Sequence, residues 1–280
     1  MTLGGRLRYL AVCSRPRFWL YLAGPVAVGV TYAAATTADL FTPMTIALAG
    51  YFLIPANVLL YGINDVFDAD IDELNPKKED RETRYGGDPL IPAAVGASAL
   101  LAAVPAALMP PLSWPWLAGF IVLGVAYSAP PARLKTRPPL DSLSNGLYVL
   151  PGVAAYAAVS GTHPPALAVV GGWLWAMAMH TFSAIPDIEP DRRAGIETTA
   201  TRLGEGRTYA YCARCWTTAA VAFGLLDPRL GALLACYPVG VVLVARSSVD
   251  VARAYWWYPA VNTVVGAVFT MGGLWRLVHG

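Results

Sequence analysis

The sequence is poor in charge. Only 14% of its 280 residues are charged and 56% are hydrophobic, whereas soluble domains carry about 25% charged residues. Apolar runs of roughly 18 to 20 residues recur along the chain, and each is long enough to cross a hydrocarbon core of about 30 Å. A soluble all-α protein is excluded, because it could not bury so many helices that are apolar on every side. The composition predicts an all-α, polytopic membrane protein.

Other features are also missing. The four cysteines show no paired metal spacing, and Cys212 and Cys215 fall within one predicted membrane helix, where packing is favoured over redox or zinc chemistry. The net charge is only +2, and no pattern typical of nucleic-acid binding occurs. No cleavable signal is evident, because the first apolar run continues into a full-length span. We therefore expect membrane lipids as surroundings and no nucleic-acid partner.

The apolar pattern predicts nine transmembrane helices in a single domain over residues 1–280. Proline and glycine interrupt nearly every span, which membrane helices tolerate when neighbouring groups satisfy the freed backbone. The expected spans are 18–36, 44–63, 91–109, 114–128, 141–160, 165–185, 209–226, 229–245 and 256–277.

The basic residues predict the orientation. If the nine spans alternate, 17 of the 20 basic residues fall in loops on one side, Arg214 lies early in the seventh span close to that side, and only Arg229 and Arg276 lie opposite. The positive-inside rule makes the basic side cytoplasmic. The N-terminus is then cytoplasmic and the C-terminus lies on the other side. The two longest loops, near 64–90 and 186–208, share the basic side and hold most of the acidic residues, so we expect them to form a polar cap over the active site.

The first long loop opens with the acidic stretch NDVFDADID, residues 64–72. On a helix Asp65, Asp68 and Asp72 stand three and seven positions apart, so their carboxylates share one face. Like charges repel, and a folded chain does not gather them without a counterion. The stretch therefore predicts a cation site at the end of the second span.

A second acidic stretch, PDIEPD, begins the other long loop. Asp187 and Asp191 share a face if this turn is helical, and Pro190 is expected near the first turn of a short helix. Mg²⁺ prefers oxygen ligands and is usually shared with substrate phosphates. The two stretches thus predict a common Mg²⁺ and diphosphate site. Candidate basic partners in nearby loops are Lys77, Arg133, Lys135, Arg192 and Arg202.

Two other interpretations use the same residues. The acidic stretches are solvated loop charges in the first. In the second the protein is a cation transporter, which would place carboxylates near the bilayer midplane inside a span. The predicted spans lack acidic residues, and this counts against transport.

Three motifs together resemble the UbiA family of intramembrane prenyltransferases. They are NDxxDxxxD at Asn64–Asp72, DxExD at Asp187–Asp191 and YSAPPARLK at 127–135, and the resemblance covers essentially the whole chain. It implies helices around a central lipid-facing cavity. It also implies that Mg²⁺ ions held by the two acidic motifs bind an isoprenyl diphosphate, whose allylic carbon is joined to an acceptor.

The resemblance suggests a role for each candidate residue. One metal is expected on Asp65, Asp68 and Asp72, and the other on Asp187 and Asp191. Negative charge grows on the leaving diphosphate, and cations stabilise it there. The residues expected to bind substrate are Asn64, Lys77, Tyr127, Arg133, Lys135, Tyr148 and Arg202.

A carbocation needs a dry pocket with electron-rich rings. Aromatic residues on spans near the motifs are candidates, with core packing as the alternative for each of them. His180 is either a base or a satisfied buried histidine. The candidate rings are Tyr61, Tyr127, Tyr148, Trp173, Trp175 and Phe182.

A narrower resemblance concerns NDVFDADIDELNPKKEDRETRY and FSAIPDIEPDRRAGIETTATRLG, which are similar to the lycopene elongase branch of the family. It implies transfer of dimethylallyl units to lycopene on the way to fifty-carbon carotenoids. The chain departs from the quinone-type pattern, because RTxxRP is missing after Asp72 and Pro190 replaces a glycine. The alternatives are a quinone precursor or another lipid acceptor, or a non-catalytic carrier or channel. Proton loss and water addition both remain open as the last step.

Overall fold

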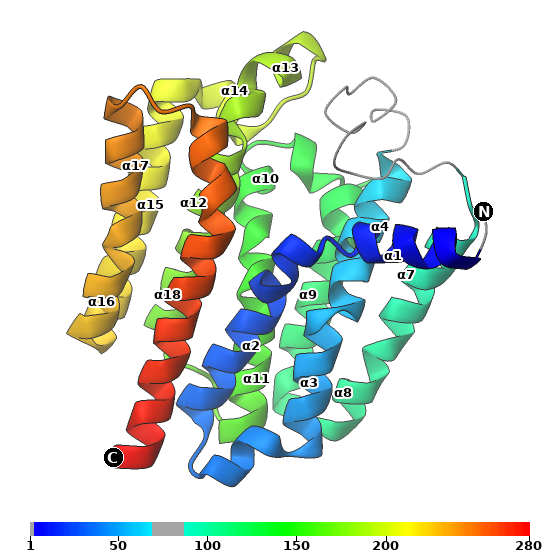
Figure 1. Ribbon diagram of the computed structural model, residues 1–280, viewed down its shortest axis with the longest axis vertical. Helices are drawn as coiled ribbons and strands as arrows, with labels where there is room; N and C mark the ends of the chain where they lie inside the picture. The colour runs from blue at the N-terminus through cyan, green and yellow to red at the C-terminus, as the bar shows by residue number, and fades with distance from the viewer. Residues whose placement is uncertain (1–2, 69–86) are drawn as a thin grey trace.

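The computed structural model describes residues 3–68 and 87–280, and every element in these residues is helical (Figure 1). The α-helices (α) and short 3₁₀ helices (η) are α1 Leu3–Cys13, η1 Pro16–Phe18, α2 Trp19–Ala33, η2 Thr37–Phe41, α3 Pro43–Leu53, α4 Pro55–Phe67, α7 Leu90–Leu101, α8 Ala103–Leu108, η3 Pro111–Ser113, α9 Trp114–Ser128, η4 Leu134–Thr136, α10 Leu140–Leu143, η5 Ser144–Tyr148, α11 Leu150–Ser160, α12 Ala166–Ser183, η6 Ile185–Asp187, α13 Ile188–Arg193, α14 Thr199–Leu203, α15 Glu205–Leu226, α16 Pro228–Leu234, α17 Cys236–Arg246 and α18 Val251–His279.

Most of the long helices run along the long axis of the molecule, and α1 lies across it (Figure 1). Six helical stretches in the described residues are long and apolar enough to cross a membrane, and they match predicted spans two, three, four, six, eight and nine. They are Pro43–Phe67, Leu90–Leu108, Pro111–Ser128, Ala166–Arg193, Pro228–Arg246 and Val251–His279.

The other three predicted spans are helical but do not reach that standard. α2 has 15 residues, which is about 22 Å of helix against a hydrocarbon core of about 30 Å. The segment from α10 to α11 is interrupted by η5. α15 carries Glu205, Arg207 and Arg214 in its first half. Six of the nine predicted spans thus coincide with helices that are long and apolar enough to cross a membrane, and the other three stay predictions.

Two clusters of buried apolar side chains form the core. The first lies mainly among α2, α3, α4, α9 and α11 and includes Phe52 and Phe120. The second lies mainly among α12, α15, α17 and α18 and includes Phe182 and Trp216. Each acidic stretch therefore follows a helix that contributes to a different cluster.

Helix α2 connects the two clusters. It packs against α11 on one side and α18 on the other. A Cβ atom added to Gly29 would lie 2.2 Å from the carbonyl oxygen of Gly152. This is a steric clash with backbone, and α2 and α11 would have to move apart to remove it. Glycine at position 29 thus allows the close approach of these two helices.

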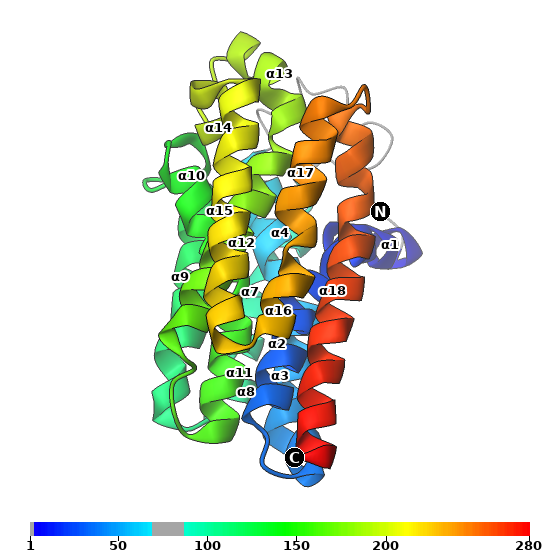
Figure 2. The same ribbon diagram turned by 90° about the vertical axis from the view of Figure 1, so that its left-hand side faces the viewer.

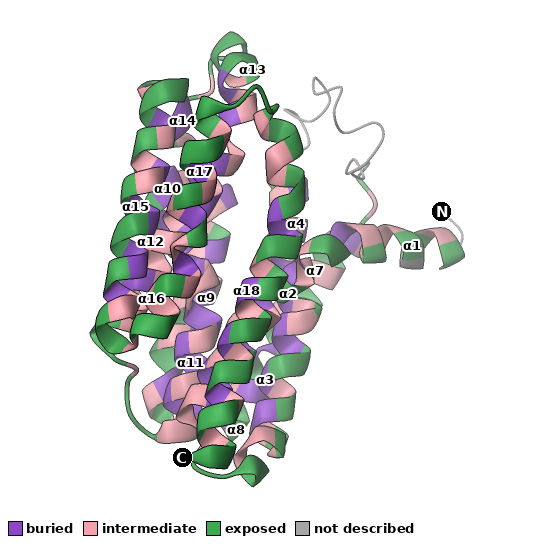
Figure 3. Ribbon diagram, turned by 60° about the vertical axis from the view of Figure 1, so that its left-hand side comes forward, coloured by how far each residue is buried: buried purple, intermediate pink, exposed green. Residues whose placement is uncertain are grey.

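The outer surface is rich in apolar side chains. On α18 alone Trp257, Val264, Met271 and Trp275 are exposed, and Figure 3 shows exposed residues along the outward faces of α15, α17 and α18. An outer surface of this kind suits contact with lipid hydrocarbon and would be unusual in water.

The two ends of the bundle differ. One end, called the polar end here, is where α4 and α9 finish and where α13 and α14 lie, as Figures 1 and 2 both show. The C-terminus and the α2–α3 connection lie at the other end. The described residues of both acidic stretches therefore lie at the same end of the molecule, as the alternation of spans predicts.

Candidate active site

Helix α4 ends within the first residues of the acidic stretch. Pro55 begins the helix, where its missing N–H leaves no intrahelical bond unmade. The helix ends at Phe67, and the backbone N–H of Asp68 donates to the carbonyl oxygen of Asn64 at 3.0 Å. Asn64 and Asp65 thus occupy the last turn and Asp68 the position directly beyond it, so all three reach the polar end.

Asp65 is buried, and Arg15 lies beside it. Nη2 of Arg15 lies 3.3 Å from Oδ1 of Asp65, whose side chain is only 3% exposed. Arg15 precedes η1 with a left-handed φ of 48°, and its guanidinium carbon lies 4.7 Å from the ring centre of Tyr61. A buried carboxylate needs a partner of opposite charge. Arg15 supplies it here and also makes a cation–π contact.

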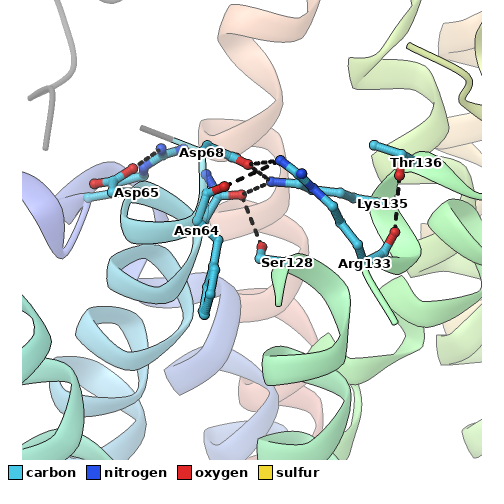
Figure 4. Close-up of polar contacts among 9 residues, drawn as sticks. Asn64, Asp65, Asp68, Ser128, Arg133, Lys135 and Thr136 are labelled. Atoms are coloured by element: carbon cyan, nitrogen blue, oxygen red, sulfur yellow. Dashed lines mark hydrogen bonds and ion pairs between the residues drawn. The ribbon is translucent and has the colours of Figure 1, made fainter. Parts of the chain in front are cut away.

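Asp68 and Asn64 contact the segment that follows α9. Nη2 of Arg133 lies 3.2 Å from Oδ1 of Asp68, and Nζ of Lys135 contacts the same oxygen. Oδ1 of Asn64 accepts from Nζ of Lys135 at 3.3 Å and from Oγ of Ser128 at 3.2 Å. Figure 4 shows these side chains converging on the end of α4. The YSAPPARLK stretch and the first acidic stretch therefore form one polar cluster.

The carboxylates of Asp65 and Asp68 point toward different partners on different sides of the helix end (Figure 4). The expectation of one shared face does not hold for these two residues, because α4 ends between them and Asp68 leaves with φ −104°. Asp72 and Lys77, which are predicted for the same site, lie outside the described residues.

The second acidic stretch forms two short helices at the polar end. Asp187 is the last residue of η6 and Asp191 lies in α13, and both are half-buried. Nη1 of Arg192 donates to Oε1 of Glu189 at 2.9 Å, and Nη2 donates to a backbone carbonyl of α14. The short helix expected around Pro190 is present, and Arg192 fixes it to α14.

A layer of aromatic rings lies beside the first acidic stretch. Oη of Tyr61, one turn before Asp65 on α4, is 3.3 Å from Oη of Tyr148. Tyr148 also meets the edge of Tyr21, with ring centres 6.3 Å apart. Oη of Tyr127 lies 3.5 Å from Nε2 of His180. Carboxylates and cations at the polar end, with electron-rich rings next to them, can hold a diphosphate and stabilise a cationic carbon.

The sequence matches the UbiA prenyltransferase family over residues 22–269. The chain belongs to the UbiA prenyltransferase family. It is accordingly a multi-pass membrane protein.

Relatives of this UbiA-family protein are similar along nearly the whole chain. Lycopene elongase/hydratase of Haloferax volcanii is 67% identical over 278 residues, which cover 99% of this chain and 92% of that protein. Lycopene elongase/hydratase of Halobacterium salinarum is 63% identical over 273 residues, which cover 98% and 99%. A solved UbiA homolog from Archaeoglobus fulgidus, bound to DMAPP and Mg²⁺, has a TM-score of 0.75, covering 95% of this chain and 99% of that chain at 19% identity. This likeness shows a shared fold.

The structure separates the candidate rings of this UbiA-family chain into two groups. Phe182 is fully buried against Tyr258, with ring centres 4.8 Å apart, and so belongs to the second core cluster. Trp175 packs on Tyr237 at 5.7 Å in the same cluster. Nε1 of Trp173 donates to a backbone carbonyl of α10 at 2.9 Å. Packing explains these three, which leaves the tyrosines as ring candidates.

The expectation that the predicted spans lack acidic residues is wrong, because Asp141 lies in one of them. It is the first residue of the predicted fifth span and is 1% exposed, so the predicted spans do contain an acidic residue. Its Oδ2 accepts from the backbone N–H of Thr199 at 2.7 Å, and its Oδ1 accepts from Oγ1 of Thr199 at 2.5 Å. Asp141 therefore holds the start of α14 near the polar end and does not lie at a bilayer midplane.

Sequence reasoning also missed Arg15 and Ser128 as members of the site. Arg15 belonged to a basic group that served only to predict orientation, and Ser128 lay unremarked within YSAPPARLK.

Of the remaining predicted residues, Arg202 lies on α14 with an exposed side chain. Within residues 3–68 and 87–280, no three His, Cys, Asp or Glu side chains are grouped to hold a metal. The described parts of the two acidic stretches therefore do not by themselves form one ligand cluster.

Proposed function

We propose that this chain is a lycopene elongase/hydratase, which transfers dimethylallyl groups from dimethylallyl diphosphate to lycopene and adds water to the product. The observation that carries the proposal is the identity of 63% and 67%, over nearly the whole chain, to two proteins of that name. The polar cluster at the end of α4 is suited to bind the diphosphate. The rings beside it are suited to stabilise the cationic carbon.

Mg²⁺ is the metal that the acidic stretches would hold. Carboxylate oxygens are ligands that Mg²⁺ prefers, and Asp65, Asp68 and Asp72 offer them on one stretch, with Asp187 and Asp191 on the other. The chemistry of this donor set fits a hard divalent cation. When bound, Mg²⁺ supplies positive charge where the leaving diphosphate becomes more negative.

Arg133 and Lys135 bind the diphosphate oxygens. Both now contact Asp68, so they lie where a phosphate next to that carboxylate would be. Asn64, which accepts from Lys135, orients the ammonium group and a phosphate oxygen through its amide. Charge-assisted hydrogen bonds of this kind are about twice as strong as neutral ones. Lys77 and Arg202 are additional phosphate ligands in this proposal.

Tyr61, Tyr127 and Tyr148 surround the allyl group as it becomes cationic. A ring within about 6 Å of a cation stabilises it by roughly 0.5–2 kcal/mol. All three side chains are half-buried, and the hydroxyl groups of Tyr61 and Tyr148 share one hydrogen bond. A site lined in this way keeps bulk water from the cation.

Lycopene approaches from the membrane side into a central lipid-facing cavity, which the loops near 64–90 and 186–208 cap. Residues 1–280 act as one domain. The polar end faces the cytoplasm, because the basic side chains of the site lie there and basic loops stay inside. The C-terminus then lies on the opposite side of the membrane.

The proposal is tested with the purified protein in lipid vesicles that contain lycopene, dimethylallyl diphosphate and Mg²⁺. We expect release of diphosphate and carotenoid products heavier by one and two five-carbon units, and EDTA should abolish both. If lycopene stays unchanged while a quinone precursor gains a prenyl group, the acceptor assignment is wrong. If no acceptor supports diphosphate release, the enzyme assignment is wrong and a carrier becomes the better interpretation.

A further inference from the structure

His180 is an ionisable side chain within a membrane-spanning stretch. It lies on α12, inside Ala166–Arg193, and its Nε2 is 3.5 Å from Oη of Tyr127. The two rings meet edge to face, with centres 5.9 Å apart. Ionisable groups inside membrane-spanning helices are expensive to bury, face the interior of a helix bundle and commonly have a functional role. Neither phosphate binding nor core packing accounts for this histidine.

The segment beside Tyr127 is held in place by hydrogen bonds. η5, which packs against α9, carries Asn145, whose Nδ2 donates to the backbone carbonyl of Asp141 at 2.6 Å. Asp141 in turn accepts from the backbone N–H of Thr199. The helix that carries Tyr127 therefore packs on a fixed segment, and the imidazole has a defined neighbour.

The second ring nitrogen of His180 is available. Within the described part of the chain, Nδ1 makes no hydrogen bond, and the side chain is half-buried. A neutral imidazole has one donor and one acceptor nitrogen. When Nε2–H donates to Tyr127, Nδ1 is the acceptor and can receive a proton from a water molecule beside it.

The pair lies next to the place where the new carbon–carbon bond would form. Tyr127 directly precedes Ser128, whose hydroxyl donates to Asn64 of the first acidic stretch. Asn145 and Tyr148 share η5, and Tyr148 contacts Tyr61 on α4. His180 thus contacts Tyr127, one of the rings that would surround the allyl cation.

We infer that His180 is the general base that directs water onto the carbocation formed after prenyl transfer. The inference rests on the proposed function and specifies its last step. In that step the C–O bond of the allylic diphosphate has broken, and its carbon has bonded to one carbon of a terminal lycopene double bond. The other carbon of that bond is a tertiary cation. A water oxygen bonds to it, one water proton moves to Nδ1 of His180, and the alcohol keeps the other hydrogen. The imidazolium then releases its proton to solvent.

The choice of base follows from ordinary acidities. At neutral pH a tyrosine hydroxyl has no basic lone pair comparable with that of imidazole, because the usual pKa of tyrosine is about 10 and that of histidine about 6.5. Without a base that holds water, the tertiary cation loses a neighbouring C–H proton and becomes an alkene. His180 would therefore decide between a hydrated product and one lighter by a water molecule.

The test compares products of the wild-type protein with those of His180→Gln and His180→Asn in vesicles containing lycopene, dimethylallyl diphosphate, Mg²⁺ and ¹⁸O-labelled water. We expect both variants to release diphosphate and consume lycopene. The ratio of labelled alcohol to alkene should fall at least about tenfold. Tyr127→Phe should lower the ratio by less, because Nδ1 remains but its orientation is lost. His163→Gln is the matched control, since His163 is exposed on the loop after α11.

Each outcome supports or overturns the inference. If the wild-type protein makes the alcohol and the His180 variants make it in the same ratio, the inference is wrong and the proposed function stands. The inference is equally wrong if folded His180 variants release no diphosphate, because His180 would then act in transfer. If neither His180 variant folds, an unchanged ratio in Tyr127→Phe overturns the inference. A wild-type protein that makes only the alkene also overturns it, whereas one that leaves lycopene untouched overturns the proposed function.

Discussion

The two acidic stretches are alike in sequence and differ in surroundings. The first ends a long apolar helix, and its carboxylates contact Arg15, Arg133 and Lys135, which are 50 or more positions away in the chain. The second lies on short helices, where Arg192 contacts Glu189 three positions before it and the neighbouring α14. The contacts of Asp65 and Asp68 therefore cross the helix bundle, whereas the pair of Glu189 and Arg192 is local.

This difference suggests that the two acidic stretches have different roles in substrate binding. The first stretch is held by tertiary contacts and should fix the position of the diphosphate. The second lies on η6 and on the six-residue helix α13, and it should adjust when substrate binds. Substitutions in each stretch test this distinction, and their effects should decrease in the order Asp68, Asp187, Lys135 and Glu189.

Asp68→Asn should impair the enzyme most. It removes the negative charge between Arg133 and Lys135 without changing the size of the side chain. We expect diphosphate release to fall at least about 1,000-fold, which corresponds to about 4 kcal/mol of transition-state stabilisation. Glu197→Gln, at an exposed position, is the control and should keep wild-type turnover. Turnover of Asp68→Asn within about threefold of wild type would remove this residue from the site.

Asp187→Asn should have a smaller effect, about 100-fold on turnover, and part of the loss should be recovered at high Mg²⁺ concentration. The reason is that a short helix can shift to let the remaining carboxylates bind the metal. A Mg²⁺ titration of diphosphate release measures the change. A dependence on Mg²⁺ identical to wild type, with full turnover, would mean that only the first stretch holds metal.

Lys135→Gln should act mainly on substrate binding. The lost ammonium group makes charge-assisted contacts, each contributing about 1.5–3 kcal/mol, so the KM for dimethylallyl diphosphate should rise about 10- to 100-fold. Arg137→Gln is the matched control on the same segment, because Arg137 is exposed and its guanidinium donates to the backbone carbonyl of Pro131. An equal rise in both variants would point to a general loss of positive charge.

Glu189→Gln should change the protein least. Its ion pair with Arg192 is exposed on both sides, and exposed pairs contribute about 0.2–1 kcal/mol. Thermal unfolding in detergent should therefore shift only slightly, and turnover should stay at the wild-type level. A large loss of turnover would show that Glu189, and not only Asp187 and Asp191, belongs to the metal site.

Much of the fold follows from the sequence, because apolar length and Pro/Gly punctuation are local properties. The predicted spans 44–63 and 141–160 lie in helical segments, but the breaks at Ile54 and η5 were not predicted. Helices in such chains are interrupted where neighbouring helices can satisfy the backbone. Periodicity along one segment does not report on those neighbours.

The candidate site was predictable in its residue types and only partly in its contacts. Arg133 and Lys135 were expected near the acidic residues, and they contact Asp68. The pairing of Arg15 with Asp65 and of Asp141 with Thr199 was not expected. These pairs join residues 50 and 58 positions apart, and the arrangement of the helices, not any local pattern, brings them together.

Both acidic stretches are proposed to hold metal around one diphosphate. Binding of Mn²⁺, followed by electron paramagnetic resonance with a non-hydrolysable thiolo analogue of dimethylallyl diphosphate present, measures this property without turnover. We expect tight Mn²⁺ binding that depends on the analogue and is weakened by Asp68→Asn and by Asp187→Asn alike. Wild-type Mn²⁺ binding in a folded Asp187→Asn variant would contradict a shared site.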